Sequence, residues 1–180
     1  TGKNAYLFTS AEDTINIGGN LVINGGNLAL ATAGNNVVMK VNREFILKSG
    51  GLFDAIPKKI SKGNLEFQTG TKMFLKSGTF SMTGKYSSLV IQNEMLTWFQ
   101  DTATVVLPDV VVMPGCTLRI AGKQLGPVSE NKTILISPTA MINCGIASVT
   151  GNGTFRLEEN GSMATAHTEA IYSDSTAGVV

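Results

Sequence analysis

The chain has 180 residues, of which 43% are hydrophobic and 15% charged, and its formal net charge is +1. This length suits one domain with a substantial core, and low charge with ample hydrophobicity is the reverse of the balance that keeps chains disordered. The near-neutral charge argues against nucleic acid and anionic lipid as partners, and no apolar run reaches the length of about 18 residues that a membrane helix needs.

A short apolar motif recurs in the first half of the chain. Two apolar residues stand at alternate positions, and a glycine follows five residues after the first. The motif occurs in the segments Leu21–Gly26, Phe45–Gly50, Leu65–Gly70 and Met73–Gly78. After three of these glycines a further short apolar segment resumes. Period-two alternation that is punctuated by Gly, Asn and Ser predicts short strands separated by turns, and no helical period is sustained there.

The predicted strands are evenly spaced along the chain. Their first residues are Leu21, Phe45, Leu65, Leu89, Val110, Ile134 and Phe155. The intervals are 24, 20, 24, 21, 24 and 21 residues, with a mean a little above 22. Such a repeat is typical of an all-β, single-stranded right-handed parallel β-helix, or β-solenoid. The alternative is an antiparallel β-sandwich, which also has short strands with frequent turns. The near-constant interval favours the solenoid.

Stacking of these coils predicts which side chains form the core. Alternate residues of a strand point to opposite faces, so columns of apolar side chains face inward while charged neighbours face water. The expected inward residues are Leu21, Ile23, Phe45, Leu47, Leu65, Phe67, Ile134, Ile136, Phe155 and Leu157. Leu21, Phe45 and Leu65 are expected to share one column. On this interpretation residues 1–180 form one solenoid domain. Both chain ends are apolar, so we expect a segment cut from a longer protein.

One stretch, at about residues 84–104, loses the glycine pattern, and we expect it to bend or protrude. It contains Tyr86, Trp98 and Phe99, and Trp98 is the only tryptophan of the chain. Aromatic side chains on the flank of a β-helix can stack on sugar rings, so these three residues are the predicted contact site for a glycan or a protein partner. The alternative is that Trp98, Phe99 and their apolar neighbours cover a widened coil.

The remaining chemistry-bearing residues do not form a recognisable catalytic or metal-binding motif. The single histidine, His167, has no Cys or second His at ligand spacing, and no nucleophile motif accompanies it. The aspartates are scattered along the chain, without the clustering that polysaccharide cleavage needs. Cys116 and Cys144 are interpreted as two buried thiols in preference to a disulfide. We therefore expect no enzyme activity, no metal and no cofactor.

Two segments resemble a known group of proteins. The run Ile15–Leu28 and the run Val149–Leu157 are similar to the repeated "GNLxIxGG" coils of large secreted, adhesin-like bacterial surface proteins. Those proteins are β-helical and are common in bacteria that export through the type IX route. The resemblance covers about two-thirds of the chain and implies an extracellular location and a structural or adhesive role. It carries no catalytic residue over, because the motifs encode the shape of a coil.

Three functions remain in view from the sequence. The first is a rigid, non-catalytic β-helical stalk on a bacterial cell surface or in a secreted protein, which binds glycan or a partner protein. The second is a carbohydrate-binding or polysaccharide-processing module, and the third is a segment of a trimeric fibre or tail spike. The expected partners are neighbouring coils of a longer chain, a surface glycan or protein, and further copies that associate end to end.

Overall fold

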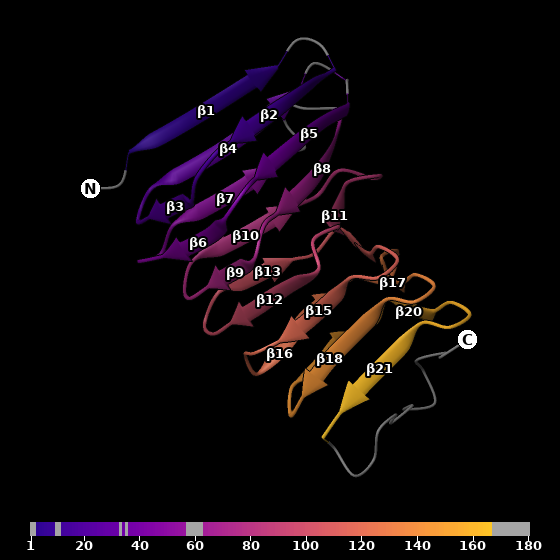
Figure 1. Cartoon of the computed structure of the whole chain (residues 1–180). Helices are drawn as coiled ribbons and strands as arrows, with labels where there is room; N and C mark the ends of the chain where they lie inside the picture. The colour runs from indigo at the N-terminus through magenta and orange to yellow at the C-terminus, as the bar shows by residue number, and fades with distance from the viewer. Residues whose placement is uncertain (1–2, 10–11, 33, 35, 57–62, 167–180) are drawn as a thin grey trace.

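The computed structural model describes residues 3–9, 12–32, 34, 36–56 and 63–166, and these contain strands and turns without a helix. The 21 strands follow one another in a fixed rotation, so every third strand returns to the same face. Figure 1 shows the resulting stack, with β1 at one end and β21 at the other.

Three long faces, sheets A, B and C, run along the stack. Sheet A contains β1 (Asn4–Thr9), β4 (Asn27–Thr32), β7 (Leu52–Ala55), β10 (Thr79–Met82) and β13 (Thr104–Val106). Sheet B contains β2 (Asp13–Ile17), β5 (Asn36–Val41), β8 (Asn64–Thr69), β11 (Ser88–Ile91), β14 (Asp109–Val112), β17 (Thr133–Ile136) and β20 (Thr154–Leu157). Sheet C contains β3 (Leu21–Asn24), β6 (Glu44–Lys48), β9 (Lys72–Leu75), β12 (Met95–Gln100), β15 (Thr117–Ile120), β18 (Met141–Gly145) and β21 (Ser162–Thr165).

The face that begins as sheet A is continued by a separate two-stranded sheet D. Sheet D contains β16 (Gln124–Val128) and β19 (Ser148–Gly151). No main-chain ladder joins β13 to β16, whereas sheets B and C run unbroken from the first coil to the last. The stack is therefore continuous on two faces and interrupted on the third.

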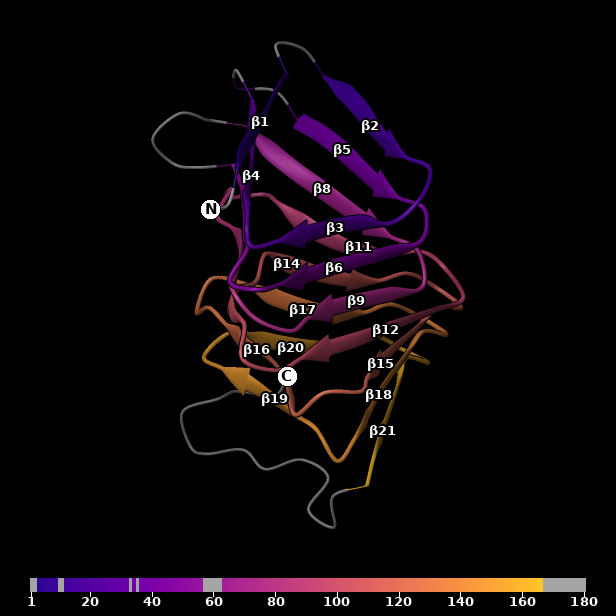
Figure 2. The ribbon, with the colours of Figure 1, turned by 90° about the vertical axis from the view of Figure 1, so that its left-hand side faces the viewer.

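Every pair of neighbouring strands runs parallel. The register joins Leu21 to Phe45 on sheet C and Val37 to Leu65 on sheet B. Figure 2 shows the strands of sheet C, from β3 to β18, one beneath another. The predicted parallel β-solenoid is confirmed, and the antiparallel sandwich is excluded because strands in a sandwich of that kind pair in opposite directions.

The prediction that Leu21, Phe45 and Leu65 share one column is wrong in its third member. Phe45 pairs with Met73, while Leu65 lies on sheet B opposite Val37. The steps between paired residues on sheet C are 24, 28, 25, 22, 24 and 21 residues. A turn therefore averages about 24 residues, longer than the 22 predicted, because the predicted step from Phe45 to Leu65 passes from sheet C to sheet B and is less than one full turn.

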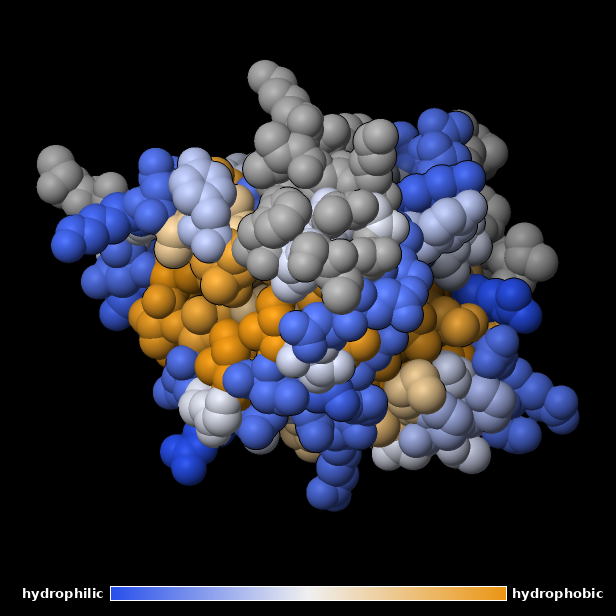
Figure 3. Space-filling model, turned by 90° about the horizontal axis from the view of Figure 1, so that it is seen from above, coloured by the Kyte–Doolittle hydropathy of each residue, from blue (hydrophilic) through white to orange (hydrophobic). Residues whose placement is uncertain are grey.

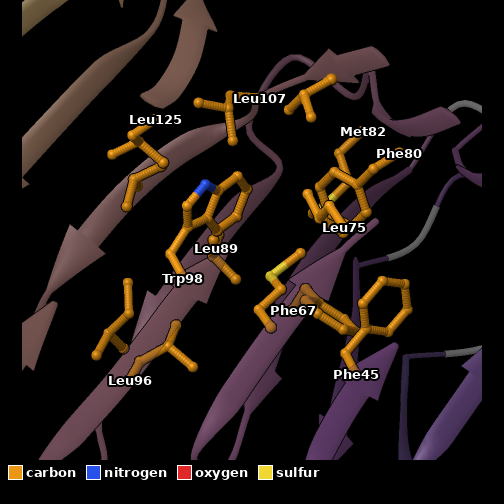
Figure 4. Packing of buried hydrophobic residues seen from close by; sticks show 14 of the residues in the cluster. Phe45, Phe67, Leu75, Phe80, Met82, Leu89, Leu96, Trp98, Leu107 and Leu125 are labelled. Carbon is orange, nitrogen blue, oxygen red and sulfur yellow. The ribbon is translucent and has the colours of Figure 1, made fainter. Parts of the chain in front are cut away.

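The core contains inward side chains from all faces, and four phenylalanines form a cluster of ring contacts within it. Phe45 of sheet C makes edge contacts with Phe53 of sheet A and Phe67 of sheet B, at centroid distances of 5.3 and 5.4 Å. Phe80 stacks on Phe53 at 5.3 Å. Figure 4 shows Phe45, Phe67 and Phe80 converging on the interior. Such ring pairs contribute about 0.5–1.5 kcal/mol each beyond the area they bury.

Most of the predicted inward residues are buried. Leu21 and Phe155 are partly buried and pack against the core. Leu157 is the exception, since its side chain is 43% exposed. It lies on β20, the last strand of sheet B among the described residues, and no described strand of that sheet covers its outer side.

The stretch at residues 84–104 is regular, contrary to expectation. It contains β11 and β12, which pair with strands on both sides in sheets B and C. The pattern of Gly turns is lost because polar side chains take over at the corners. Asn93 Nδ2 donates hydrogen bonds to the carbonyl oxygens of Thr69 and Gly70, at 2.9 and 3.0 Å.

Candidate functional site

The three predicted contact residues do not lie together. Tyr86 is in the turn between sheets A and B and is 69% exposed. Trp98 points inward from β12 and is fully buried, whereas Phe99 points outward from the same strand. Trp98 therefore belongs to the core, and the prediction that it is a contact residue is wrong. Tyr86 and Phe99 remain as separate surface aromatics.

Trp98 has a structural role where sheet A stops. Its indole Nε1 donates to the carbonyl oxygen of Gln124, at 3.3 Å. Two residues on, Gln100 Nε2 donates to the carbonyl oxygen of Gly126, at 2.8 Å. Both acceptors are on β16, which has no ladder with β13, so side chains of β12 supply hydrogen bonds at the break. Figure 4 shows the Trp98 ring beside Leu89 and facing Leu125.

The outward face of sheet C carries an apolar column that we call the sheet C ladder. It consists of Val22, Ile46, Phe74 and Phe99, which the register places opposite one another in four successive strands. Val22 is 46% exposed, and the other three are partly exposed. The rings of Phe74 and Phe99 meet edge to face, with centroids 5.9 Å apart. Of these four residues only Phe99 is a predicted contact residue, because Met73, Phe74 and Leu75 are apolar in both alternating frames and do not show which side chain points outward.

Cations flank the ladder on both sides. Lys48 and Lys76 follow Ile46 and Phe74 on one side and lie opposite each other, since Leu47 pairs with Leu75. On the other side the column is Glu44, Lys72, Thr97 and Arg119. Lys72 bridges to Glu44 at 3.1 Å, and its Nζ is 5.8 Å from the Phe74 ring centroid.

The carboxylates are spread over different faces. Within the described part of the chain, no three His, Cys, Asp or Glu side chains gather closely enough to hold a metal ion. Asp54 is on sheet A, where burial raises the pKa of its carboxyl group and a hydrogen bond with Ser81 opposes that rise. Asp109 is on sheet B and pairs with Lys132 at 3.3 Å. His167 and Asp174 lie outside the described residues.

Lys132 acts as a clamp between three coils. Its Nζ donates to the carbonyl oxygens of Gly84 and Lys85, at 3.3 and 2.9 Å, and to Asp109 Oδ2. Its side chain is only 13% exposed. We expect Lys132→Met to lower the free energy of unfolding by about 1–3 kcal/mol, because these acceptors lose their donor. Chemical denaturation measures the change. The exposed control Lys123→Met is expected to leave stability unchanged, and equal effects of both variants would contradict the clamp.

The two cysteines are free thiols, both buried, so the interpretation without a disulfide is confirmed. Burial raises the pKa of both thiols and so reduces the fraction of reactive thiolate at any given pH. We expect slow reaction of native Cys116 and Cys144 with a thiol reagent at pH 8, and fast reaction of both in denaturant. The course of labelling is followed by mass spectrometry. Equally fast labelling of the folded protein would contradict this prediction.

Comparison with known proteins returns no relative. No protein-family model matches the chain, and neither does any curated protein or any solved structure. The described residues also contain no helix of the length and apolarity that a membrane crossing requires.

Proposed function

We propose that this chain is a non-catalytic structural and adhesive segment of an extracellular bacterial surface protein, in which the coil stack serves as a rigid rod. The observation that carries the proposal is the unbroken parallel ladder of sheet B, which runs through seven strands from β2 to β20. Its hydrogen bonds point along the long axis, so bending the rod means stretching bonds and unpacking the aromatic core. The extracellular location rests on the resemblance of the runs Ile15–Leu28 and Val149–Leu157 to coils of secreted surface proteins.

A turnover assay tests the non-catalytic part of the proposal. The purified chain is incubated with acidic and with neutral polysaccharides, with and without calcium, and new chain ends are measured. We expect no product above a protein-free control. Cleavage that is lost on replacement of a single Asp or Glu would overturn the proposal in favour of a polysaccharide-processing enzyme.

The trimeric fibre is the second candidate, because it needs an exposed apolar stripe along the rod. The sheet C ladder is such a stripe, but it covers only four coils and continues at the fifth with Ala121. Around a symmetry axis it would also bring the flanking cations of Lys48, Lys76 and Arg119 near their own copies. Repulsion between like charges disfavours that arrangement.

The N-terminal end of the stack favours end-to-end contact with another coil. The edge strands β1, β2 and β3 have one side free of ladder partners among the described residues. Ile15, Ile17, Leu21 and Leu28 are only partly buried there, and Figure 3 shows apolar atoms on this end. Exposed edge strands over an apolar surface are templates for strand addition.

We therefore expect the isolated chain to self-associate as its concentration rises. Static light scattering over a concentration series measures the mean mass. The variant Ile17→Lys is expected to reduce self-association, because it places a positive charge on the apolar N-terminal end of the stack. A chain that stays monomeric at high concentration would contradict the prediction.

A further inference from the structure

The sheet C ladder combines two properties that a plain spacer does not need. Its apolar side chains point outward, where a spacer would carry polar residues: Val22 is 46% exposed, and Ile46, Phe74 and Phe99 keep part of their surface in water. The ladder is also continuous over four strands that are separated by 24, 28 and 25 residues of sequence. The fold thus assembles a narrow apolar track, about three coil spacings of 4.8 Å long, parallel to the axis of the rod.

The charge beside this track is positive. The outward positions of the sheet C strands, together with Lys76 directly after β9, carry Lys48, Lys72, Lys76 and Arg119 against a single acidic residue, Glu44. The carboxylate of Glu44 forms a salt bridge with Lys72. Among the described residues, Lys48, Lys76 and Arg119 make no ion pair within 4.0 Å. Two further acidic residues, Glu94 and Asp101, lie in the turns on either side of β12. Asp101 follows Gln100, the partner of Leu75, and so lies across from Lys76, but no ion pair joins the two. Lys48, Lys76 and Arg119 are therefore available to an anionic ligand.

We propose that the outward face of sheet C binds an acidic, carboxylated polysaccharide that lies along the sheet C ladder. This inference rests on the adhesive role proposed above and names its ligand class. The apolar C–H faces of sugar rings pack on Phe74 and Phe99, and the carboxylates pair with Lys48, Lys76 and Arg119. Successive coils advance by about 4.8 Å, comparable to the advance of one sugar ring in an extended chain. Each sugar then meets one coil.

The experiment measures binding of the purified chain to polygalacturonate, a carboxylated polysaccharide, by isothermal titration calorimetry at low salt. We expect binding that weakens as salt is raised, because exposed charges are screened, and no binding to neutral dextran. The double variant Lys76→Gln/Arg119→Gln and the variant Phe99→Thr are each expected to weaken binding at least tenfold. The matched controls Lys40→Gln and Val111→Thr, on the outward face of sheet B, are expected to bind as the parent chain does.

Circular dichroism and the unfolding midpoint establish that each variant is folded. Lys76 and Arg119 are exposed, so the double variant Lys76→Gln/Arg119→Gln is expected to stay folded and still tests the site if Phe99→Thr loses stability. Absence of polygalacturonate binding, or binding that the sheet C variants leave unchanged, would overturn the inference. So would equal binding of poly-L-glutamate that depends on the same residues, which would indicate an acidic peptide.

The same experiments separate this inference from the proposed function. Binding of a neutral glycan through Tyr86, with no effect of the sheet C variants, would refute the sheet C site and leave the adhesive role intact. Cleavage of polygalacturonate together with binding at sheet C would refute the non-catalytic role and leave the site intact.

Discussion

Replacement of Phe67 by aspartate is expected to unfold the solenoid or to lower its free energy of unfolding by more than about 5 kcal/mol. The Phe67 side chain is fully buried and touches the rings of Phe45, Phe53 and Phe80. Loss of a buried phenylalanine alone costs about 3–5 kcal/mol, and an unpaired carboxylate in its place adds the cost of a desolvated charge. Circular dichroism and urea denaturation measure the effect.

The control for this variant is Phe74→Asp, the same change on the outward face. There the new carboxylate reaches water and lies near Lys72, so we expect a folded chain with a much smaller loss. If the two variants had equal effects, the assignment of Phe67 to the interior and Phe74 to the surface would be wrong. The comparison tests the alternation of faces on which the whole coil depends.

Replacement of Gly78 by alanine is the second change with a large expected effect. Gly78 has a φ of +100°, and a Cβ there would lie 2.0 Å from the carbonyl oxygen of Gly51 in the preceding coil. The neighbouring atoms are main chain and cannot turn aside. Overpacking costs about 1–3 kcal/mol and a left-handed non-glycine residue about 1–2 kcal/mol, so we expect a loss of about 2–5 kcal/mol.

Gly50→Ala separates the two contributions. Gly50 also has a positive φ, of +72°, but a Cβ at this position meets nothing within 4 Å. We therefore expect only the conformational cost, about 1–2 kcal/mol. Urea denaturation of both variants measures the difference, and a Gly50→Ala loss as large as that of Gly78→Ala would show that close coil packing is not the cause.

Local alternation made the fold class predictable. In Phe45–Leu47 and Leu65–Phe67 the inward apolar residues stand two apart and the intervening residue points outward. The sequence therefore indicates which side chains face the core and which face water. Repetition of such strands at intervals near 22 residues then indicated stacked coils. The inward positions followed directly, and most of them are buried.

Segments with apolar residues in both alternating positions could not be assigned in the same way. Met95–Phe99 and Met73–Leu75 offer an apolar residue on each face, so alternation does not say which points inward. The candidate site was affected most by this ambiguity, because Trp98 was included among the predicted contact residues beside the alternative of core packing, and Phe74 was missed. The tertiary structure resolves it through the hydrogen bonds that Trp98 and Gln100 make with β16.

The sequence by itself determined the strand–turn rhythm, the parallel solenoid and the near-neutral, helix-poor character of the chain. Only the tertiary structure decided which strands stack on which face, because the connections between strands vary in length. The same motif also occurs on different faces: Leu65–Gly70 begins on sheet B, whereas Phe45–Gly50 begins on sheet C. The sheet C ladder is the clearest case. Val22, Ile46, Phe74 and Phe99 become neighbours through inter-strand register, a long-range property that no local pattern of residues contains.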